Sequence, residues 1–315
     1  MASLLVIGEC MMELRAAEAN SYRRAFAGDT YNTAVYAKRW QETSQVSMYS
    51  SVGRDAISES MLANWAQEGV DASLVTFSDE RLPGIYSIST DGQGERNFSY
   101  WRKGSAATQM MALLERSGGT ETIPDFDCVY FTGLSLAILD DESKQLLLDM
   151  VSALRSRGAK VAFDPNYREK LWKDSAQAAH WMTKAYRLCD IALPGVEDHA
   201  ALYSQHSVQS ICQFLKAENV EEIVIKGGRG GVFCYLDGLP VHHQVLIPAA
   251  QQIDSTAAGD SFAGTYLAAR MSGSSCEEST HAAAALAKLV VQYPGAIIDS
   301  DIYQDFFLNF KRSLT

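Results

Sequence analysis

The stretch Asp254-Ser-Thr-Ala-Ala-Gly-Asp260 is followed directly by Ser261-Phe-Ala-Gly-Thr-Tyr-Leu-Ala-Ala269. Glycine and small residues in the first segment let a backbone turn come close to a ligand. The second segment is predicted to be helical, because Phe262, Tyr266 and Ala269 return to one face. A helix that begins at such a turn directs unpaired N–H groups and a partial positive charge at whatever lies above it. The pattern therefore predicts an anion site at this helix N-terminus.

Asp260 stands in the first turn of this predicted helix. An acid beside an anion site is a candidate proton acceptor for a hydroxyl group that attacks a phosphate. The alternative is an N-terminal helix cap, which is the better interpretation of a lone aspartate. The full seven-residue string favours the catalytic interpretation.

Short β-rich runs alternate with longer helical stretches along the 315 residues. The predicted strands are 4–8, 45–51, 128–132, 160–164, 190–194 and 222–226, and the predicted helices are 55–69, 140–158, 175–188 and 207–219. Several of the strands are near-continuous apolar runs, which is typical of buried parallel strands. The alternation predicts an α/β fold, with a parallel sheet covered by helices on both faces.

Residues 82–102 break this pattern. Two segments of alternating polarity flank Asp91-Gly-Gln-Gly-Glu95, which is a hairpin signal. On the second arm Phe98, Tyr100 and Arg102 share one face, and Trp101 points to the other. Judged on this segment alone, a lid over a site and a surface hairpin without function are equally supported.

Composition excludes several classes of function. The net charge of −11 and the lack of a basic cluster argue against nucleic-acid binding. No apolar run approaches the ~20 residues that span a bilayer, and the segment 1–9 has no basic leader and is predicted to be a first strand. The six cysteines are scattered, without the spacing of a zinc site or a disulfide framework, so we expect reduced thiols in a cytoplasmic protein.

Three segments resemble a known family. Asp254 to Asp260 resembles the C-terminal signature of the ribokinase-like carbohydrate kinases, in which Ala257 is usually glycine. Ala27-Gly-Asp-Thr-Tyr-Asn32-Thr resembles their N-terminal signature, and Gln292-Tyr-Pro-Gly-Ala-Ile297 matches a later stretch. The resemblance implies one ribokinase-like domain over 1–315: a three-layer α/β sandwich with a mostly parallel central sheet. It also implies a small β-lid formed by roughly 10–30 and 82–104.

Lys226-Gly-Gly-Arg-Gly-Gly231 follows one predicted strand and precedes another. It is neither a Walker A loop nor a dinucleotide fingerprint, because no helix follows it. Taken alone, a hairpin turn is an equally good interpretation. The segment also resembles the family's Lys-x-Gly-x-x-Gly stretch, which lines the groove for ATP, through Lys226, Gly228 and Gly231.

The same resemblance assigns further roles around the phosphate. It makes Asp260 the catalytic base, and it makes the amides of Ala257, Ala258 and Gly259 the donors that stabilise charge on the transferring group. Asn166 and Ala284 are placed on the nucleotide side. Packing alone would equally explain the helix that contains Ala284.

Two arginines are the candidates for binding an acidic substrate. A sugar acid needs a partner for its carboxylate, and arginine suits that planar anion best. Arg102 lies on the second arm of the predicted hairpin, and Arg168 follows a strand at its carboxyl end, where open α/β sheets bind ligands. For either arginine alone, solvated surface charge is the better interpretation.

The segments that contain these arginines resemble the substrate-binding stretches of 2-keto-3-deoxygluconate kinases, a group within the family. The residues that would contact the sugar acid are then Gly28, Asp29, Asn32, Tyr86, Tyr100, Arg102 and Arg168. We expect ATP-dependent phosphorylation of the 6-hydroxyl, giving 2-keto-3-deoxy-6-phosphogluconate. These residues do not distinguish the gluconate-derived substrate from its C4 epimer, because selection of one hydroxyl group depends on the geometry of the site.

Two alternatives remain open: a kinase of a neutral sugar such as fructose or ribose, and a non-catalytic sugar-acid-binding protein of the same fold. Mg²⁺ is expected because it neutralises the phosphates of ATP. The family's Asn-x-x-Glu metal motif corresponds to Pro194-Gly-Val-Glu197, so Glu197 is the candidate that acts through water, and an exposed acid at a helix start is the alternative. The oligomeric state is left open: lids of this family often pair between subunits, and Trp101 on the outer face of the lid would suit such a homo-oligomer.

Overall fold

The computed structural model describes residues 2–17, 21–90 and 96–313. Its main sheet has eight strands in the order β14-β13-β12-β11-β10-β9-β1-β4. Their bounds are β1 Ser3–Ile7, β4 Gln45–Tyr49, β9 Cys128–Thr132, β10 Lys160–Asp164, β11 Ile191–Ala192, β12 Glu222–Lys226, β13 Val232–Leu236 and β14 Leu239–Gln244. All pairs from β4 to β12 are parallel, and β13 and β14 are antiparallel additions. The predicted strands and the mostly parallel sheet are confirmed.

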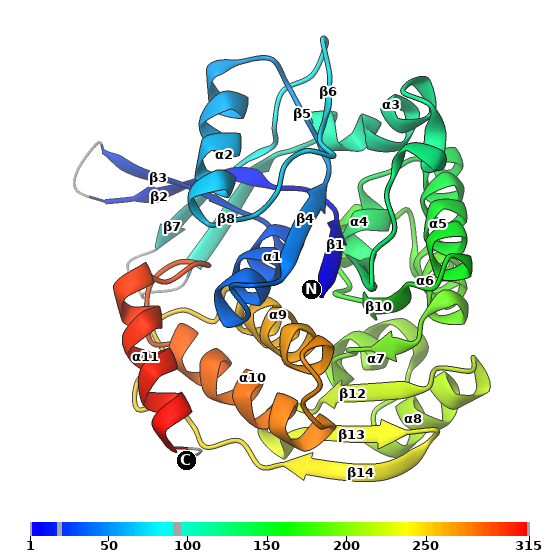
Figure 1. The fold of residues 1–315 in the computed structure, drawn as a ribbon, viewed down its shortest axis with the longest axis vertical. Helices are drawn as coiled ribbons and strands as arrows, with labels where there is room; N and C mark the ends of the chain where they lie inside the picture. Colours follow the sequence, from blue (N-terminus) through cyan, green and yellow to red (C-terminus); the bar gives the residue numbers. More distant parts are fainter. Residues whose placement is uncertain (1, 18–20, 91–95, 314–315) are drawn as a thin grey trace.

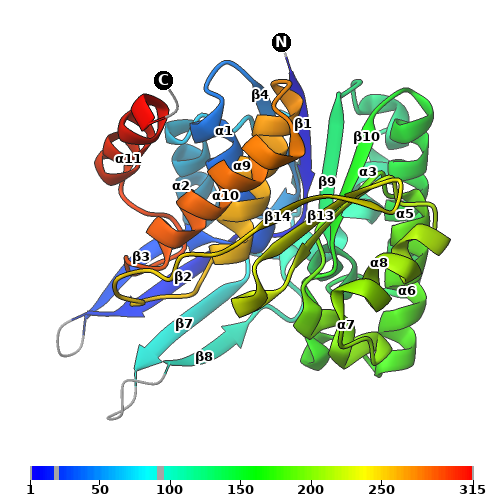
Figure 2. The ribbon, with the colours of Figure 1, turned by 90° about the horizontal axis from the view of Figure 1, so that it is seen from below.

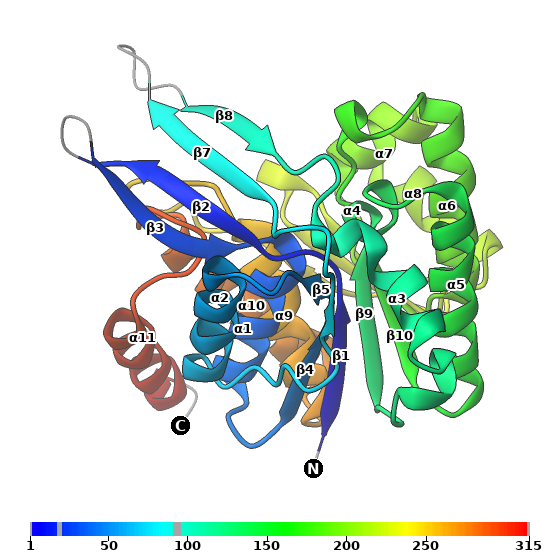
Figure 3. The ribbon, with the colours of Figure 1, turned by 90° about the horizontal axis from the view of Figure 1, so that it is seen from above.

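Helices cover both faces of the main sheet (Figures 1 and 3). One layer contains α1 Asp29–Trp40, α2 Ala56–Gln67, α9 Ala258–Met271, α10 Cys276–Val290 and α11 Ser300–Ser313. The other contains α3 Met110–Arg116, α4 Gly133–Ala137, α5 Asp141–Ser156, α6 Ser175–Leu188, α7 Val196–Tyr203 and α8 Val208–Ala217. The expected three-layer α/β architecture is therefore confirmed. In the part of the chain that the structure describes, no helix is both long and apolar enough to cross a bilayer.

Two hydrophobic cores lie on the two faces of the sheet. Successive side chains of β1 point to opposite faces, so Leu5 and Ile7 join the core under α5 and α6. Leu4 and Val6 join the core under α1 and α9. Because both faces are buried, the strand needs apolar residues at consecutive positions, which explains the continuous runs in the sequence.

A second sheet has four strands in the order β3-β2-β7-β8 and extends away from the main body (Figure 2). The bounds are β2 Met11–Ala16, β3 Tyr22–Ala27, β7 Ile85–Thr90 and β8 Arg96–Trp101. β7 and β8 are antiparallel, as the two predicted arms require, and the predicted turn at 91–95 lies outside the described residues. The other short pair is β5 Ser51–Val52 with β6 Thr76–Phe77.

Helices α1 and α9 pack closely, which positions the candidate site. A side chain at Gly264 of α9 would clash with the backbone carbonyl of Thr33 in α1, so only glycine allows this approach. The predicted helix is confirmed, and its residues 261–269 are all buried, on every side of the helix and not on one face alone. The close contact aligns the first turns of the two helices, although they are far apart in the sequence.

Candidate active site

Polar side chains collect at the carboxyl ends of the parallel strands, the edge where open α/β sheets bind ligands. Thr132 ends β9, Asp164 ends β10 and Lys226 ends β12. Glu9 follows β1 by two residues. Helices α1 and α9 begin near the same edge, and each has an aspartate in its first turn.

Asp260 lies in the first turn of α9, buried against α1. Its carboxylate Oδ2 accepts a hydrogen bond of 2.8 Å from Nδ2 of Asn32. Burial, together with the nearby charge of Asp29, raises the pKa of Asp260 from 3.8 to about 7. A carboxyl group with that pKa is suited to accept a proton near neutral pH.

The turn before α9 has an unusual backbone. Ala257, the residue that differs from the usual family glycine, adopts a left-handed conformation with φ 60° at the N-cap. Non-glycine residues rarely adopt this conformation, and it orients the following amides of Ala258 and Gly259 at the start of the helix. The amide of Ala258 makes a long hydrogen bond of 3.3 Å to the carbonyl of Ser255. The predicted anion site therefore has the expected helix N-terminus.

Asp29 is at the start of α1, directly after Gly28. Its Oδ2 accepts hydrogen bonds from Thr132 Oγ1 at 2.7 Å and from Asn166 Nδ2 at 2.8 Å. Asn166 has a positive φ of 33°, and its own amide donates to Asp164 Oδ1 at 3.1 Å. Asn166, which we expected on the nucleotide side, thus uses its side chain to hold Asp29.

Lys226 connects the glycine loop to the strand ends. Its Nζ forms an ion pair of 2.5 Å with Asp164 Oδ2 and lies beside Gly259, where an added Cβ would be 3.7 Å away.

Asp198, in the first turn of α7, is a further acid at this edge of the sheet. Its Oδ1 accepts a hydrogen bond of 3.2 Å from the amide N–H of Tyr167. Burial and the neighbouring charge of Asp164 raise the pKa of Asp198 to about 6.

Glu197, the predicted metal-associated acid, is exposed in the first turn of α7. Its neighbour Asp198 is the acid that faces Asp164 and Lys226. One residue along a helix rotates a side chain by about 100°, so the two acids cannot share a direction. The structure therefore places Asp198, and not the predicted Glu197, on the side of α7 next to Asp164 and Lys226.

An apolar groove of about 470 Å³ lies beside α9 and α10. It is lined by four of the five predicted nucleotide residues, Lys226, Gly228, Gly231 and Ala284, and by Ala258 and Gly259 at the start of α9; Asn166 is not among its lining residues. The groove fits ATP, because its apolar walls suit a base, while Lys226 and the N-terminus of α9 suit phosphates. Sequence reasoning missed the segment 245–248, which forms one wall. The signal in the sequence is the apolar run Val245-Leu-Ile-Pro248, of which Val245 and Ile247 remain 65% and 71% exposed in the structure.

Two predicted sugar-acid residues of the second sheet, Tyr86 and Tyr100, have stacked aromatic rings. Their ring centroids are 5.7 Å apart, and the hydroxyl of Tyr86 donates to Glu13. Arg102, which follows β8, pairs with Glu9. Sequence reasoning missed both glutamates, because nothing in their spacing relates them to their partners.

The two predicted arginines have different environments. Arg102 is nearly buried, and its guanidinium is held by Glu9. Arg168 is exposed and makes a long hydrogen bond of 3.4 Å to the carbonyl of Tyr167. Its charge offsets part of the rise in the pKa of Asp198 that burial and Asp164 cause. The structure thus gives each arginine its own partner.

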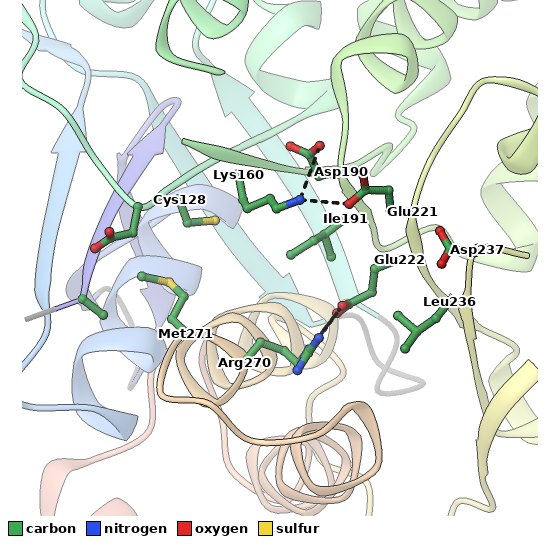
Figure 4. Close-up of a pocket in the computed structure, with 12 residues that line it drawn as sticks. Cys128, Lys160, Asp190, Ile191, Glu221, Glu222, Leu236, Asp237, Arg270 and Met271 are labelled. Carbon is green, nitrogen blue, oxygen red and sulfur yellow. Dashed lines mark hydrogen bonds and ion pairs between the residues drawn. The ribbon is translucent and has the colours of Figure 1, made fainter. Parts of the chain in front are cut away.

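Another cavity, of about 710 Å³, lies at the opposite end of the main sheet (Figure 4). Four of its charged side chains form two ion pairs: Lys160 pairs with Glu221 at 2.9 Å, and Arg270 pairs with Glu222 at 2.6 Å. It is remote from Asp260, because it opens at the amino ends of β10 and β12. The groups that could perform chemistry are therefore concentrated at the carboxyl edge.

Known proteins are similar to this chain in sequence and in fold. The pfkB family carbohydrate kinase model matches residues 1–302. A 2-dehydro-3-deoxygluconokinase of Escherichia coli (strain K12) is 38% identical over 299 residues, covering 94% of this chain and 96% of that relative.

Two solved structures share the fold at low sequence identity. The 2-dehydro-3-deoxygluconokinase of Thermotoga maritima superposes with a TM-score of 0.82 at 17% identity, covering 98% of this chain and 100% of its own. A fructokinase of Xylella fastidiosa with bound ATP gives 0.79 at 19% identity, with 98% and 99% covered. With the family model matching almost the entire length, the chain belongs to the pfkB family of carbohydrate kinases.

Proposed function

We propose that the protein transfers the γ-phosphoryl group of ATP to the 6-hydroxyl of 2-keto-3-deoxygluconate, also written 2-dehydro-3-deoxygluconate. The product is 2-keto-3-deoxy-6-phosphogluconate. The observation that carries the proposal is the position of Asp260. It lies in the first turn of α9, between the apolar groove and the polar cluster of Asp29 and Asn32. The similarity to the Escherichia coli 2-dehydro-3-deoxygluconokinase supports this choice of substrate.

Asp260 would accept the proton of the attacking hydroxyl group. Its pKa of about 7 suits this role, because a sizeable fraction of the carboxyl group is ionised at neutral pH while it remains basic enough to take a proton. Asn32 donates to Oδ2 and so orients the carboxylate. The amides at the start of α9 would stabilise the charge that develops on the transferring group.

ATP would occupy the groove, with its base against Ala284 and the segment 245–248, and with its phosphates toward Lys226 and Gly259. Mg²⁺, when bound with ATP, supplies neutralisation of phosphate charge. Asp198 is the protein carboxylate best placed to contact that ion through water, since it faces Lys226 and Asp164. We place this ATP-dependent reaction in the cytoplasm, where the six buried, free cysteines stay reduced.

The acid end of the substrate would be held by arginine. Arg102 presents a guanidinium at the base of the second sheet, next to the stacked Tyr86 and Tyr100. Arg168 adds positive charge from the loop after β10. Asp29 and Asn32 would bind hydroxyl groups of the same molecule, since both have side chains at the strand ends.

The second sheet would act as a lid that excludes water during transfer, so that ATP hydrolysis does not compete. Its outer aromatic side chains, Tyr22 and Trp101, are 61% and 62% exposed. Such a surface suits a second copy of the chain. Light scattering of the wild type and of Trp101→Glu would test this pairing: a dimer that the substitution converts to monomer is expected.

The function is tested by measuring ADP release with Mg-ATP against 2-keto-3-deoxygluconate, its galactonate epimer, gluconate, fructose and ribose. Strong preference for a keto-deoxy acid is the expected result. Preference for fructose or ribose would instead identify a neutral-sugar kinase. Binding of the acid without any ADP formed would identify a non-catalytic binding protein.

A further inference from the structure

Glu9 is a buried carboxylate that the reaction proposed above does not use. It lies two residues beyond β1 and is 4% exposed. Oε2 accepts a hydrogen bond from Nη2 of Arg102, and Oε1 accepts one of 2.5 Å from Oγ of Ser105. One carboxylate of the main body therefore holds both ends of the segment 102–105, through which the chain returns from β8.

The surrounding backbone is shaped around this contact. Gly84, the residue before β7, passes so close that an added Cβ would lie 2.9 Å from Glu9 Oε1 and 3.1 Å from Cβ of Arg102. Both distances are shorter than ordinary van der Waals contact. Glycine at position 84 thus leaves the space in which Glu9 and Arg102 meet. Three segments, after β1, before β7 and after β8, converge on this ion pair.

The pairing orients the guanidinium without using all of its donors. Nη2 of Arg102 binds Glu9, whereas Nε is buried and has no hydrogen-bond partner in the structure as described. A guanidinium has five N–H donors in one rigid plane. The bond to Glu9 and the burial of Nε together restrict the plane of the guanidinium, and the N–H groups of its Nη atoms that Glu9 does not use are left for a second carboxylate. Because the Arg102 side chain is only 12% exposed, few other orientations are open to it.

We propose that Glu9 is a positioning residue that holds Arg102 in the orientation that receives the carboxylate of the sugar acid. The inference rests on the proposed function. Its consequence is selectivity: without Glu9 the guanidinium loses its fixed orientation, and binding of the acid weakens. Phosphoryl transfer at the other end of the substrate depends on Asp260 and is preserved. A neutral sugar has no carboxylate and gains nothing from Glu9.

The test is steady-state kinetics of Glu9→Gln, which keeps the shape of the side chain and removes its charge. The expected result is a rise in KM for 2-keto-3-deoxygluconate of about 10- to 100-fold, the cost typical of a misplaced binding group. The kcat and the KM for ATP should stay within about twofold of wild type, as expected for lost substrate binding alone. The matched control is Glu222→Gln, another buried carboxylate paired with an arginine, at 2.6 Å, but at the far end of the sheet. It should leave KM for the acid unchanged.

A double-mutant cycle decides whether Glu9 acts through Arg102. In an Arg102→Met background, Glu9→Gln should change KM by less than about twofold, because the group that it positions is already absent. Full additivity of the two substitutions would overturn the inference. If Glu9→Gln does not fold, as judged by circular dichroism, Ser105→Ala removes the other partner of the carboxylate. A smaller rise in KM for the acid is then expected, and no rise would overturn the inference.

The wild-type substrate panel separates this inference from the proposed function. A wild type that prefers fructose to the keto-deoxy acid overturns the proposed function, and the role of Glu9 with it. A wild type that prefers the acid, combined with an unchanged KM in Glu9→Gln, overturns the role of Glu9 alone.

Discussion

Nδ2 of Asn32 lies 2.8 Å from Oδ2 of Asp260, across 228 residues of sequence. The contact joins the first turns of α1 and α9, the two helices that Gly264 allows to pack closely. It places the candidate base against the residues expected to hold the sugar. The same contact makes the chemistry of Asp260 dependent on a residue from the other end of the chain.

Asp260→Asn should abolish nearly all turnover. The amide cannot accept the hydroxyl proton, and loss of a general base typically costs about 10²- to 10⁴-fold in rate. ADP release measures turnover, and calorimetry measures the affinity for the sugar acid, which should remain close to wild type. Turnover near the wild-type level would refute the assignment of Asp260 as the base.

The kcat/KM of the wild type should increase with pH through about 7. The pKa of Asp260 is raised to about 7, mainly by burial, so the carboxyl group is protonated and inactive as a base below that pH. The kcat/KM profile reports ionisation in the free enzyme. The check is a profile from pH 5 to pH 9 (a range of about four units around the pKa). A profile flat between these limits would exclude this carboxyl group as the titrating base.

Asn32→Ala should move the midpoint of that profile to higher pH. The hydrogen bond from Asn32 lowers the pKa of Asp260, because it stabilises the ionised carboxylate. Without this donor, burial and the charge of Asp29 still raise the pKa of Asp260, and the hydrogen bond that lowered it is gone. The midpoint is the decisive quantity here, because the rate itself also falls if Asn32 binds the sugar. A midpoint shifted to lower pH would contradict the prediction.

The wild type should lose stability relative to Asp260→Asn as pH rises from about 4 to about 7. The folded-state pKa of Asp260, about 7, exceeds the ordinary value of 3.8, so the folded protein binds more protons in this interval. The free energy of unfolding then decreases with increasing pH. One pKa unit corresponds to about 1.4 kcal/mol, so the difference should reach a few kcal/mol at most. Urea unfolding of both proteins at several pH values measures it, and parallel pH dependences would disprove the raised pKa.

Ala257→Gly should stabilise the protein by about 0.5–1 kcal/mol. A left-handed alanine costs roughly 1–2 kcal/mol, and the greater unfolded-state entropy of glycine offsets about half of that. Ala257 has φ 60°, whereas glycine adopts this conformation without steric cost. Urea unfolding is the measurement. A clear loss of stability would mean that the methyl group, which packs near Tyr86 and Ala296, matters more than the backbone strain.

Local features were predictable from the sequence because they depend on neighbouring residues. Apolar runs predicted the buried strands, and the spacing of Phe262, Tyr266 and Ala269 predicted that α9 is a helix. Asp260 was identifiable because it lies within the same short segment as the turn that it serves. The two arms 85–90 and 96–101 were predictable from alternating polarity. The helix and the two arms follow from periodicities of about 3.6 and 2 residues, whereas the strands and Asp260 follow from short contiguous segments.

Tertiary structure alone decided which distant side chains meet. Strand order brings Glu9 to Arg102, and helix packing brings Asn32 to Asp260. The direction of a side chain on α7 decides that Asp198, and not Glu197, faces Lys226. Local periodicity assigns a residue to an element and to one of its faces, but it carries no information on which element lies opposite. Which elements lie opposite one another is decided when the apolar faces of all the elements are buried together. This packing brings Asn32 to Asp260 and Glu9 to Arg102.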